Sequence, residues 1–307
     1  MISGAQKAPT ADQVRSICRQ ALREVSDRSK TEIAFFGGSF TAIDPVYMQS
    51  LLEAAAEFTG PDGFSGIRVS TRPDAISPAI LGTLGRYGVT AIELGAQSMD
   101  DQVLQLNERG HTAADVERAS KLIRQCGFSL GLQMMTGLYG DSKESAYHTA
   151  EQLIALQPDT VRIYPTVVLR NTQLESLSRA GQYRPQTLSE AVALCSGLLL
   201  RFHRAGIRVI RLGLHPSESV EENMVAGAYH PALRELCENR IYRDAVRALL
   251  SGETAGSYDI GISPGCISKA IGQKRTNLNQ LEAEGYRVRF IECGEVPLYE
   301  VKKLNRS

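Results

Sequence analysis

Short apolar segments alternate with longer amphipathic segments over most of the chain. Six of the apolar segments have the length and composition of strands that are buried on both faces. Repeated strand–helix units with right-handed crossovers build either an open doubly wound sheet or a barrel, and the pattern alone does not choose between them. The predicted strands are Glu32–Gly37, Ile67–Thr71, Ala91–Gln97, Ser129–Met135, Thr160–Leu169 and Arg208–Leu214.

Capping signals mark where the intervening helices begin. A hydroxyl residue followed three positions later by an acid or amide has the spacing of a capping box. Pairs of this kind are Thr10 with Gln13, Ser98 with Asp101, Thr112 with Asp115, and Thr187 with Glu190. The first helix, about Ala11–Val25, precedes the first strand. Because a barrel normally begins with a strand, and a sheet beginning at Glu32 would have an unpaired edge, we expect a further strand in front of this series.

The alternation stops after Leu214. Residues Glu221–Leu250 are predicted to be helical with a break at Gly227–Pro231, and a Gly/Ser/Thr-rich linker, Ser251–Ser257, follows. The chain is therefore expected to contain a barrel region (1–220), a helical extension with linker (221–255) and a small C-terminal unit (256–307).

Charge and cysteine content narrow the possible functions only slightly. Lys plus Arg equals Asp plus Glu at 34 each, so the net charge predicts no partner. No apolar run reaches membrane-spanning length and the first residues are polar, which predicts a cytoplasmic protein without membrane contact. The six cysteines are scattered, and none forms a C-x-x-C spacing. Cys18 and Cys195 lie in helical apolar patterns, where a buried thiol is the ordinary role.

Six segments, in order and at compatible spacing, resemble the radical S-adenosylmethionine (SAM) family, of the kind seen in the catalytic subunit of Elongator. They are FFGGSF (Phe35–Phe40), STRPDAI (Ser70–Ile76), IELGAQSMDDQVLQLNERGHT (Ile92–Thr112), GLQMMTGLYG (Gly131–Gly140), VRIYPTVVLRNTQLESL (Val161–Leu177) and VIRLGL (Val209–Leu214). The resemblance covers roughly residues 1–250. It implies an α/β fold with an incomplete β/α barrel of about six parallel strands.

The glycine segment after the first predicted strand is a candidate cofactor loop. Gly37-Gly38-Ser39 lacks bulky side chains, so a ligand can approach the backbone closely. The resemblance implies that this loop holds the SAM amino group. A tight strand–helix turn is the other interpretation.

Polar residues inside the later strands are further candidates for SAM or substrate contact. Glu93 and Gln97 share a face of one strand, and Gln133 occupies the next strand. A buried acid is costly unless it is paired, so Glu93 contacts ligand or forms an internal salt bridge with Arg72 or Arg109.

Other candidates follow the third strand or belong to late strands. The resemblance implies that Arg109 pairs with the SAM carboxylate as a bidentate fork. Tyr164 and Arg211 are expected to face the barrel mouth, His111 to be structural, and Thr112 to be an N-cap.

The family requires a [4Fe–4S] cluster held by a C-x3-C-x2-C motif after the first strand, and an electron donor. This motif is not in the sequence. Ile2-Ser3-Gly4 resembles the segment just after the last cluster cysteine, so we expect this sequence to begin downstream of the cluster loop. No segment resembles the acetyltransferase domain of Elongator's catalytic subunit. Whether the chain is an active enzyme is therefore open.

The last fifty or so residues resemble the core of a KH RNA-binding domain. Strand Tyr258–Ile262, helix Cys266–Ile271, a basic turn, helix Thr276–Glu284 and strand Tyr286–Glu292 are predicted in that order. The turn is Gly272-Gln273-Lys274-Arg275, in which Arg275 replaces the second glycine of the KH G-x-x-G motif. Lys274 and Arg275 retain charge for phosphate contact. The other interpretation is a helical appendage with a solvated basic turn.

The resemblance implies a radical SAM protein that modifies tRNA in its full-length form. Two other functions remain open. One is a non-catalytic RNA-binding relic of the family. The other is an unrelated α/β barrel that binds a phosphorylated metabolite, although no phosphate loop is evident late in the barrel.

Overall fold

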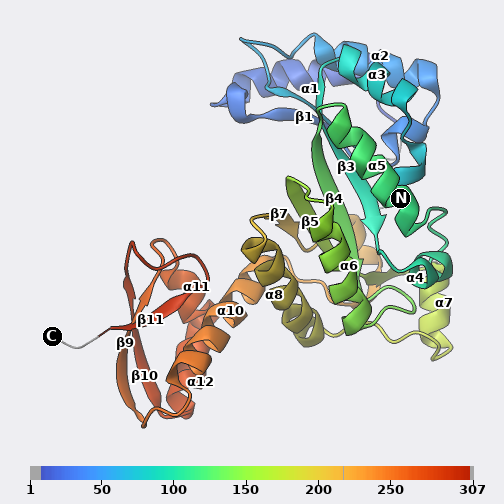
Figure 1. Ribbon diagram of the computed structural model, residues 1–307. Helices are drawn as coiled ribbons and strands as arrows, with labels where there is room; N and C mark the ends of the chain where they lie inside the picture. The colour runs from blue at the N-terminus through green and yellow to red at the C-terminus, as the bar shows by residue number, and fades with distance from the viewer. Residues whose placement is uncertain (1–7, 217, 305–307) are drawn as a thin grey trace.

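The central sheet has six parallel strands in the order β1-β2-β3-β4-β5-β7 (Figure 1). The computed structural model describes residues 8–216 and 218–304, and the Ile2-Ser3-Gly4 segment lies outside them. The strands are β1 (Glu32–Phe35), β2 (Gly66–Thr71), β3 (Val89–Gln97), β4 (Ser129–Thr136), β5 (Thr160–Pro165) and β7 (Arg208–Leu212).

The strand order follows the chain order, which decides between the two architectures that the sequence left open. Successive right-handed crossovers in one direction put the helices on one face and curl the sheet. A doubly wound sheet would instead reverse direction at an internal strand. The prediction of an incomplete six-stranded barrel is confirmed.

The helices of the barrel region begin where the capping signals lie, with one exception. Thr10, Thr112 and Thr187 form complete capping boxes. The prediction for Ser98 is wrong: Asp100 caps α4, because its carboxylate accepts from the N–H groups of Gln102 and Val103. The helices are α1 (Ala11–Glu24), α2 (Pro45–Ala56), α3 (Pro78–Arg86), α4 (Asp101–Leu106), α5 (Ala113–Gln125), α6 (Lys143–Ala155), α7 (Gln173–Arg179), α8 (Leu188–Arg204) and α9 (Glu218–Asn223).

The two faces of the sheet have opposite chemistry. Residues such as Ile92, Leu132 and Ile163 point toward the helices and are at most 1% exposed. The alternate positions point to the inside of the half-barrel and carry polar groups, among them Glu93 and Arg162. The apolar face forms the core, and the polar face is available for a ligand.

The region after β7 differs from the prediction. The predicted helix Glu221–Leu250 is α9, a strand β8 (Met224–Gly227) and a long helix α10 (Leu233–Leu250). β8 pairs antiparallel with β6 (Val167–Leu169), which is separated from β5 at Thr166. Gly227 has φ 112°, and a Cβ atom there would lie 2.9 Å from the carbonyl oxygen of Thr166. Glycine therefore permits this close pairing, which the sequence pattern did not reveal.

The C-terminal unit is a three-stranded sheet of order β10-β9-β11 with two helices. β9 (Gly256–Ile262) is parallel to β10 (Tyr286–Glu292) and antiparallel to β11 (Val301–Leu304). The helices are α11 (Ile267–Ile271) and α12 (Thr276–Ala283). The predicted order strand, helix, turn, helix, strand is present. α10 contacts both α8 of the barrel and the helices of this unit (Figure 1).

None of the described helices is both long and apolar enough to cross a membrane.

Candidate ligand sites on the barrel and the C-terminal unit

Glu93 is the centre of a charged network inside the half-barrel. Its carboxylate is 2% exposed and accepts from Nε (2.7 Å) and Nη2 (3.0 Å) of Arg162 on β5. Nη1 of Arg68 on β2 approaches the same carboxylate at 3.4 Å, and Arg68 also pairs with Glu32 at 2.7 Å. The network therefore ties β1, β2, β3 and β5 together across the inner face.

A glycine on the intervening strand makes this network possible. Gly131 of β4 lies beside Glu93, and a Cβ atom at Gly131 would come within 2.7 Å of Glu93 Cγ. The absence of that atom lets Glu93 reach across β4 to Arg162. An internal salt bridge was one of the two predicted roles of Glu93, but its partners differ from those proposed.

Neither arginine named as a salt-bridge partner contacts Glu93. Arg72 pairs with Asp74 through Nε at 2.7 Å, and Arg109 contacts Met135. Sequence reasoning missed Arg68 and Arg162. The sequence signal that could have found them is an arginine at an inward-facing position of a buried strand, on the same face as Glu93.

Gln97 and Gln133 meet near the carboxyl ends of β3 and β4. Gln133 Nε2 donates to Gln97 Oε1 at 3.2 Å. Gln97 has φ 65°, and the β3–β4 register shifts between Gly95 and Gln97. The irregular backbone turns the Gln97 side chain back over Gly95, whose added Cβ would lie 2.6 Å from Gln97 Nε2.

Arg109 is a partly buried cation without a carboxylate partner among the described residues. Its Nη2 lies 3.0 Å from Met135 Sδ, and its buried Nε has no hydrogen-bond partner. Burial lowers the pKa of Arg109. An unpaired buried donor is costly, so a ligand anion at this place would stabilise the site.

Gly37, Gly38 and Ser39 form an open loop after β1. Gly37 has φ 103°, and a Cβ atom at Gly38 would meet nothing within 4 Å. The preceding Phe36 is 50% exposed, and its ring centroid lies 4.8 Å from the guanidinium carbon of Arg162. Phe36 thus brings the end of β1 to the network on the inner face.

The remaining candidates have local partners. Arg211 donates from Nε to the Gly213 carbonyl (2.8 Å) and from Nη2 to the Leu214 carbonyl (2.7 Å). His111 Nε2 lies 3.0 Å from the Ala96 carbonyl, and Thr112 caps α5. Tyr164 shares the inner face of β5 with Arg162.

The cysteines do not fit an iron–sulfur cluster. Four are buried, Cys293 is half-buried and Cys126 is exposed. Burial raises the pKa of Cys195, and it raises that of Cys237 to about 12, so both are protonated. Across residues 8–216 and 218–304, no group of three His, Cys, Asp or Glu side chains could hold a metal ion.

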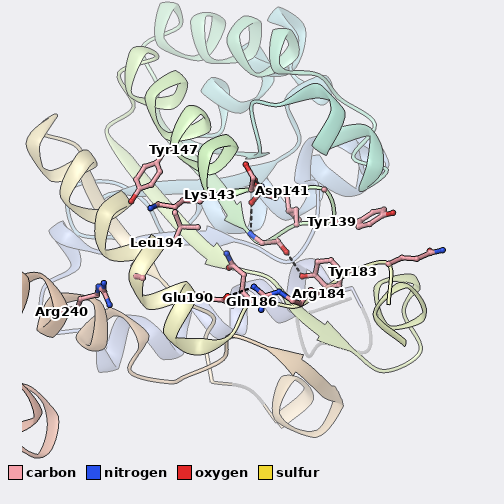
Figure 2. Close-up of a pocket in the computed structure, with 16 residues that line it drawn as sticks. Tyr139, Asp141, Lys143, Tyr147, Tyr183, Arg184, Gln186, Glu190, Leu194 and Arg240 are labelled. Carbon is pink, nitrogen blue, oxygen red and sulfur yellow. Dashed lines mark hydrogen bonds and ion pairs between the residues drawn. The ribbon is translucent and has the colours of Figure 1, made fainter. Parts of the chain in front are cut away.

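A pocket of about 700 Å³ lies next to the carboxyl end of β4, between α6, α8 and α10 (Figure 2). Its walls come from the loop after β4, the first turns of α6 and α8, the segment before α8, and one residue of α10. They are Gly137, Leu138, Tyr139, Gly140, Asp141, Ser142, Lys143, Tyr147, Gln182, Tyr183, Arg184, Gln186, Glu190, Ala193, Leu194 and Arg240. No sequence signal marked this pocket, because distant segments form it.

The turn between α11 and α12 has a strained backbone. Lys274 (φ 51°) and Arg275 (φ 62°) are both left-handed, a conformation that costs L-residues about 1–2 kcal/mol each. Asn277 is buried and donates to the carbonyls of Asn239 and Ala270 at 2.7 and 2.9 Å. A Cβ atom at Gly272 would lie 2.7 Å from Thr276 Oγ1. The hydrogen bonds of Asn277 therefore fix the position of the turn. Lys274 and Arg275 form no ion pair within the described residues.

A curled sheet of six parallel strands, with polar groups on its inner face and an open glycine loop after β1, defines a partial β/α barrel. The chain belongs to the radical SAM superfamily, whose profile matches residues 4–153, and a profile for the radical SAM C-terminal domain matches residues 158–243. This membership excludes the alternative of an unrelated barrel.

Curated relatives are similar over part of their length. The tRNA uridine(34) acetyltransferase of Dehalococcoides mccartyi is 29% identical over 210 residues, which are 58% of this chain and 46% of that protein. The protein of the same name from Methanocaldococcus jannaschii is 26% identical over 188 residues, 55% of this chain and 35% of the relative. Human Elongator complex protein 3 is 28% identical over 190 residues, with the same shares. The chain thus spans between a third and a half of these proteins.

A solved structure shares the fold. The archaeal Methanocaldococcus infernus Elp3 with an N-terminal deletion (1–46) superposes with a TM-score of 0.67 at 24% identity. The match covers 77% of this chain and 59% of that one.

Proposed function

We propose that this chain binds SAM inside the half-barrel and binds RNA through its C-terminal unit, as part of a radical SAM protein that acts on tRNA. The observation that carries the SAM assignment is Arg109, a partly buried cation whose buried Nε has no hydrogen-bond partner, at the carboxyl ends of the strands. α/β barrels bind their ligands at this end.

Several groups of the chain fit SAM. The open backbone of Gly37, Gly38 and Ser39 suits its amino group, and Arg109 suits its carboxylate. The side-chain amides of Gln97 and Gln133, which are hydrogen-bonded to each other, can donate to or accept from the ligand. Glu93 does not contact SAM directly in this proposal, because its carboxylate is already paired with two arginines. Its role is to hold the strands that carry the site in place. SAM supplies the reactive group, and the protein supplies orientation and exclusion of water.

The described cysteines cannot supply the three thiolates that a [4Fe–4S] cluster needs, so we derive no radical step from this chain. A second candidate function is a non-catalytic RNA-binding relic of the family. Anaerobic reconstitution of the chain with iron and sulfide tests this assignment of the cysteines. We expect the chain alone to show no absorbance near the cluster band and no SAM cleavage, whereas a stable cluster would contradict our ligand assignment.

The names of the curated relatives support tRNA as the RNA partner. Lys274 and Arg275 can meet phosphates, since both lie on a turn without carboxylate partners in the described chain. Charge–phosphate contacts release counterions, so affinity falls steeply with salt.

Replacing Arg109 tests SAM binding. Arg109→Met should weaken SAM binding about 10- to 150-fold, the effect of losing one charged hydrogen-bonding group. Calorimetric titration with SAM measures this change. Arg118→Met, at an exposed site on α5, is the control and should leave the affinity unchanged. Equal affinities of the Arg109 variant and the parent would contradict the assignment.

Replacing the basic turn tests RNA binding. Lys274→Ala with Arg275→Ala should weaken tRNA binding and reduce the salt slope by up to about two charges. Electrophoretic titration at two salt concentrations measures both quantities. A packing role for the C-terminal unit predicts unchanged affinity instead.

A further inference from the structure

The pocket beside β4 has a rigid wall. Asn107 Nδ2 donates to the Tyr139 carbonyl at 2.8 Å, and Tyr139 N–H donates back to Asn107 Oδ1 at 3.2 Å. Asp141 accepts from the N–H groups of Gly137 and Ser142, each at 2.9 Å. Pre-formed walls reduce the ordering cost of binding, which is typical of a ligand site.

Tyr183 closes this wall from the other side. Its hydroxyl donates to the Gly137 carbonyl at 2.6 Å, and burial raises the pKa of Tyr183 to about 12, so the donor proton is retained. The Tyr139 and Tyr183 rings meet edge to face with centroids 6.3 Å apart. One end of the pocket is therefore aromatic (Figure 2).

Besides the ion pair of Arg184 with Glu190, two further cations line the pocket. Lys143 has no ion-pair partner in the part of the chain that the structure describes. Arg240 enters from α10 and pairs only with the half-exposed Asp244 at 3.2 Å. α6 and α8 also begin here, and the positive ends of helix dipoles favour an anion.

An aromatic end together with these cations matches a nucleotide, which has a base to stack and a phosphate to neutralise. The pocket begins at Gly137, directly after the last residue of β4, the strand that also carries Gln133. A strand of RNA that presents one nucleotide to the barrel can place a neighbouring nucleotide here.

α10 connects this pocket to the basic turn. Arg240 lines the pocket, and the adjacent Asn239 reaches the turn. With its amide oriented to satisfy its neighbours, Asn239 accepts from Gln273 N–H at 3.2 Å. The pocket and the turn therefore contact adjacent residues of one helix.

We propose that this pocket binds one nucleotide of the RNA strand whose phosphates contact the turn at Gly272–Arg275. This inference rests on the proposed RNA-binding function. It assigns Tyr139 as the stacking residue and Lys143 as the phosphate contact.

The test measures binding of a fluorescently labelled tRNA anticodon stem-loop to the full chain. Tyr139→Ala should weaken binding about 5- to 150-fold, the range for loss of one base–aromatic stack, and Tyr139→Phe should retain affinity within about twofold. Lys143→Ala should reduce the salt slope by about one. Tyr87→Ala and Lys121→Ala, on α3 and α5 outside the pocket, are the matched controls.

The outcomes distinguish the two levels of the proposal. If the turn variant loses RNA affinity and Tyr139→Ala does not, the pocket inference is wrong and RNA binding stands. If the parent chain does not bind the stem-loop at low salt, both are wrong. Thermal melting excludes unfolding as the cause. If Tyr139→Ala does not fold, Lys143→Ala at its exposed site still tests the pocket, because an unchanged salt slope would contradict the inference.

Discussion

The half-barrel and the C-terminal turn use positive charge in opposite ways. Inside the barrel, Arg68 and Arg162 form ion pairs with Glu93 and Glu32, so these cations hold the strands together. On the turn, Lys274 and Arg275 have no described carboxylate partner and sit on strained backbone. Paired buried charges build the scaffold, and unpaired charges are available to a ligand. Arg109 in the barrel resembles the cations of the turn, because it too has no carboxylate partner among the described residues.

The largest expected effect comes from breaking the buried network. Glu93→Ala leaves Arg162 with an uncompensated charge while Arg68 keeps Glu32, which should lower the free energy of unfolding by ~3–5 kcal/mol. Urea denaturation measures the change. Glu151→Ala removes an exposed pair with Arg201 and should cost under ~1 kcal/mol. Similar losses for the two variants would contradict the division between scaffold and ligand charges.

A smaller effect of opposite sign is expected at the turn. Arg275→Gly removes the left-handed strain, so the free energy of unfolding should rise by ~1 kcal/mol while RNA affinity falls. Lys302→Gly, on β11, is the control and should destabilise by ~0.5–1 kcal/mol, because glycine there gains only unfolded-state freedom. Urea denaturation and RNA titration of the same samples give both values. A stabilised variant with full RNA affinity would show that the strain has no functional role.

The smallest effect concerns Asp115, an acid that is paired and only partly buried. The Thr112 backbone N–H, followed by Arg118, lowers the pKa of Asp115 to about 2. A lowered folded-state pKa gives stability that is present above the unfolded value near 4 and is lost as pH falls toward 2. Asp115→Ala should therefore cost ~0.5–1 kcal/mol at pH 6 and less at pH 3. Thermal melts at both pH values check this, with Glu117→Ala on the same helix as control.

Local sequence signals determined much of the fold. Thr10, Thr112 and Thr187 fixed helix starts because a capping box acts over four residues. Short apolar runs between helical segments marked the six strands, since each strand buries one apolar face against the helices. The glycine loop after β1 could also be predicted from the sequence, because the backbone freedom of glycine is a property of those residues alone.

Contacts between distant segments were decided only by the tertiary structure. The sequence marked Glu93 as a residue in need of a partner, but the partner depended on Gly131 and on the register that brings β5 beside β4. The β6–β8 ribbon and the pocket likewise combine segments separated by tens of residues. The sequence by itself determined what each segment is and which side chains need partners. Which partners they obtain is a matter of long-range geometry, because no local pattern encodes a contact across the sheet.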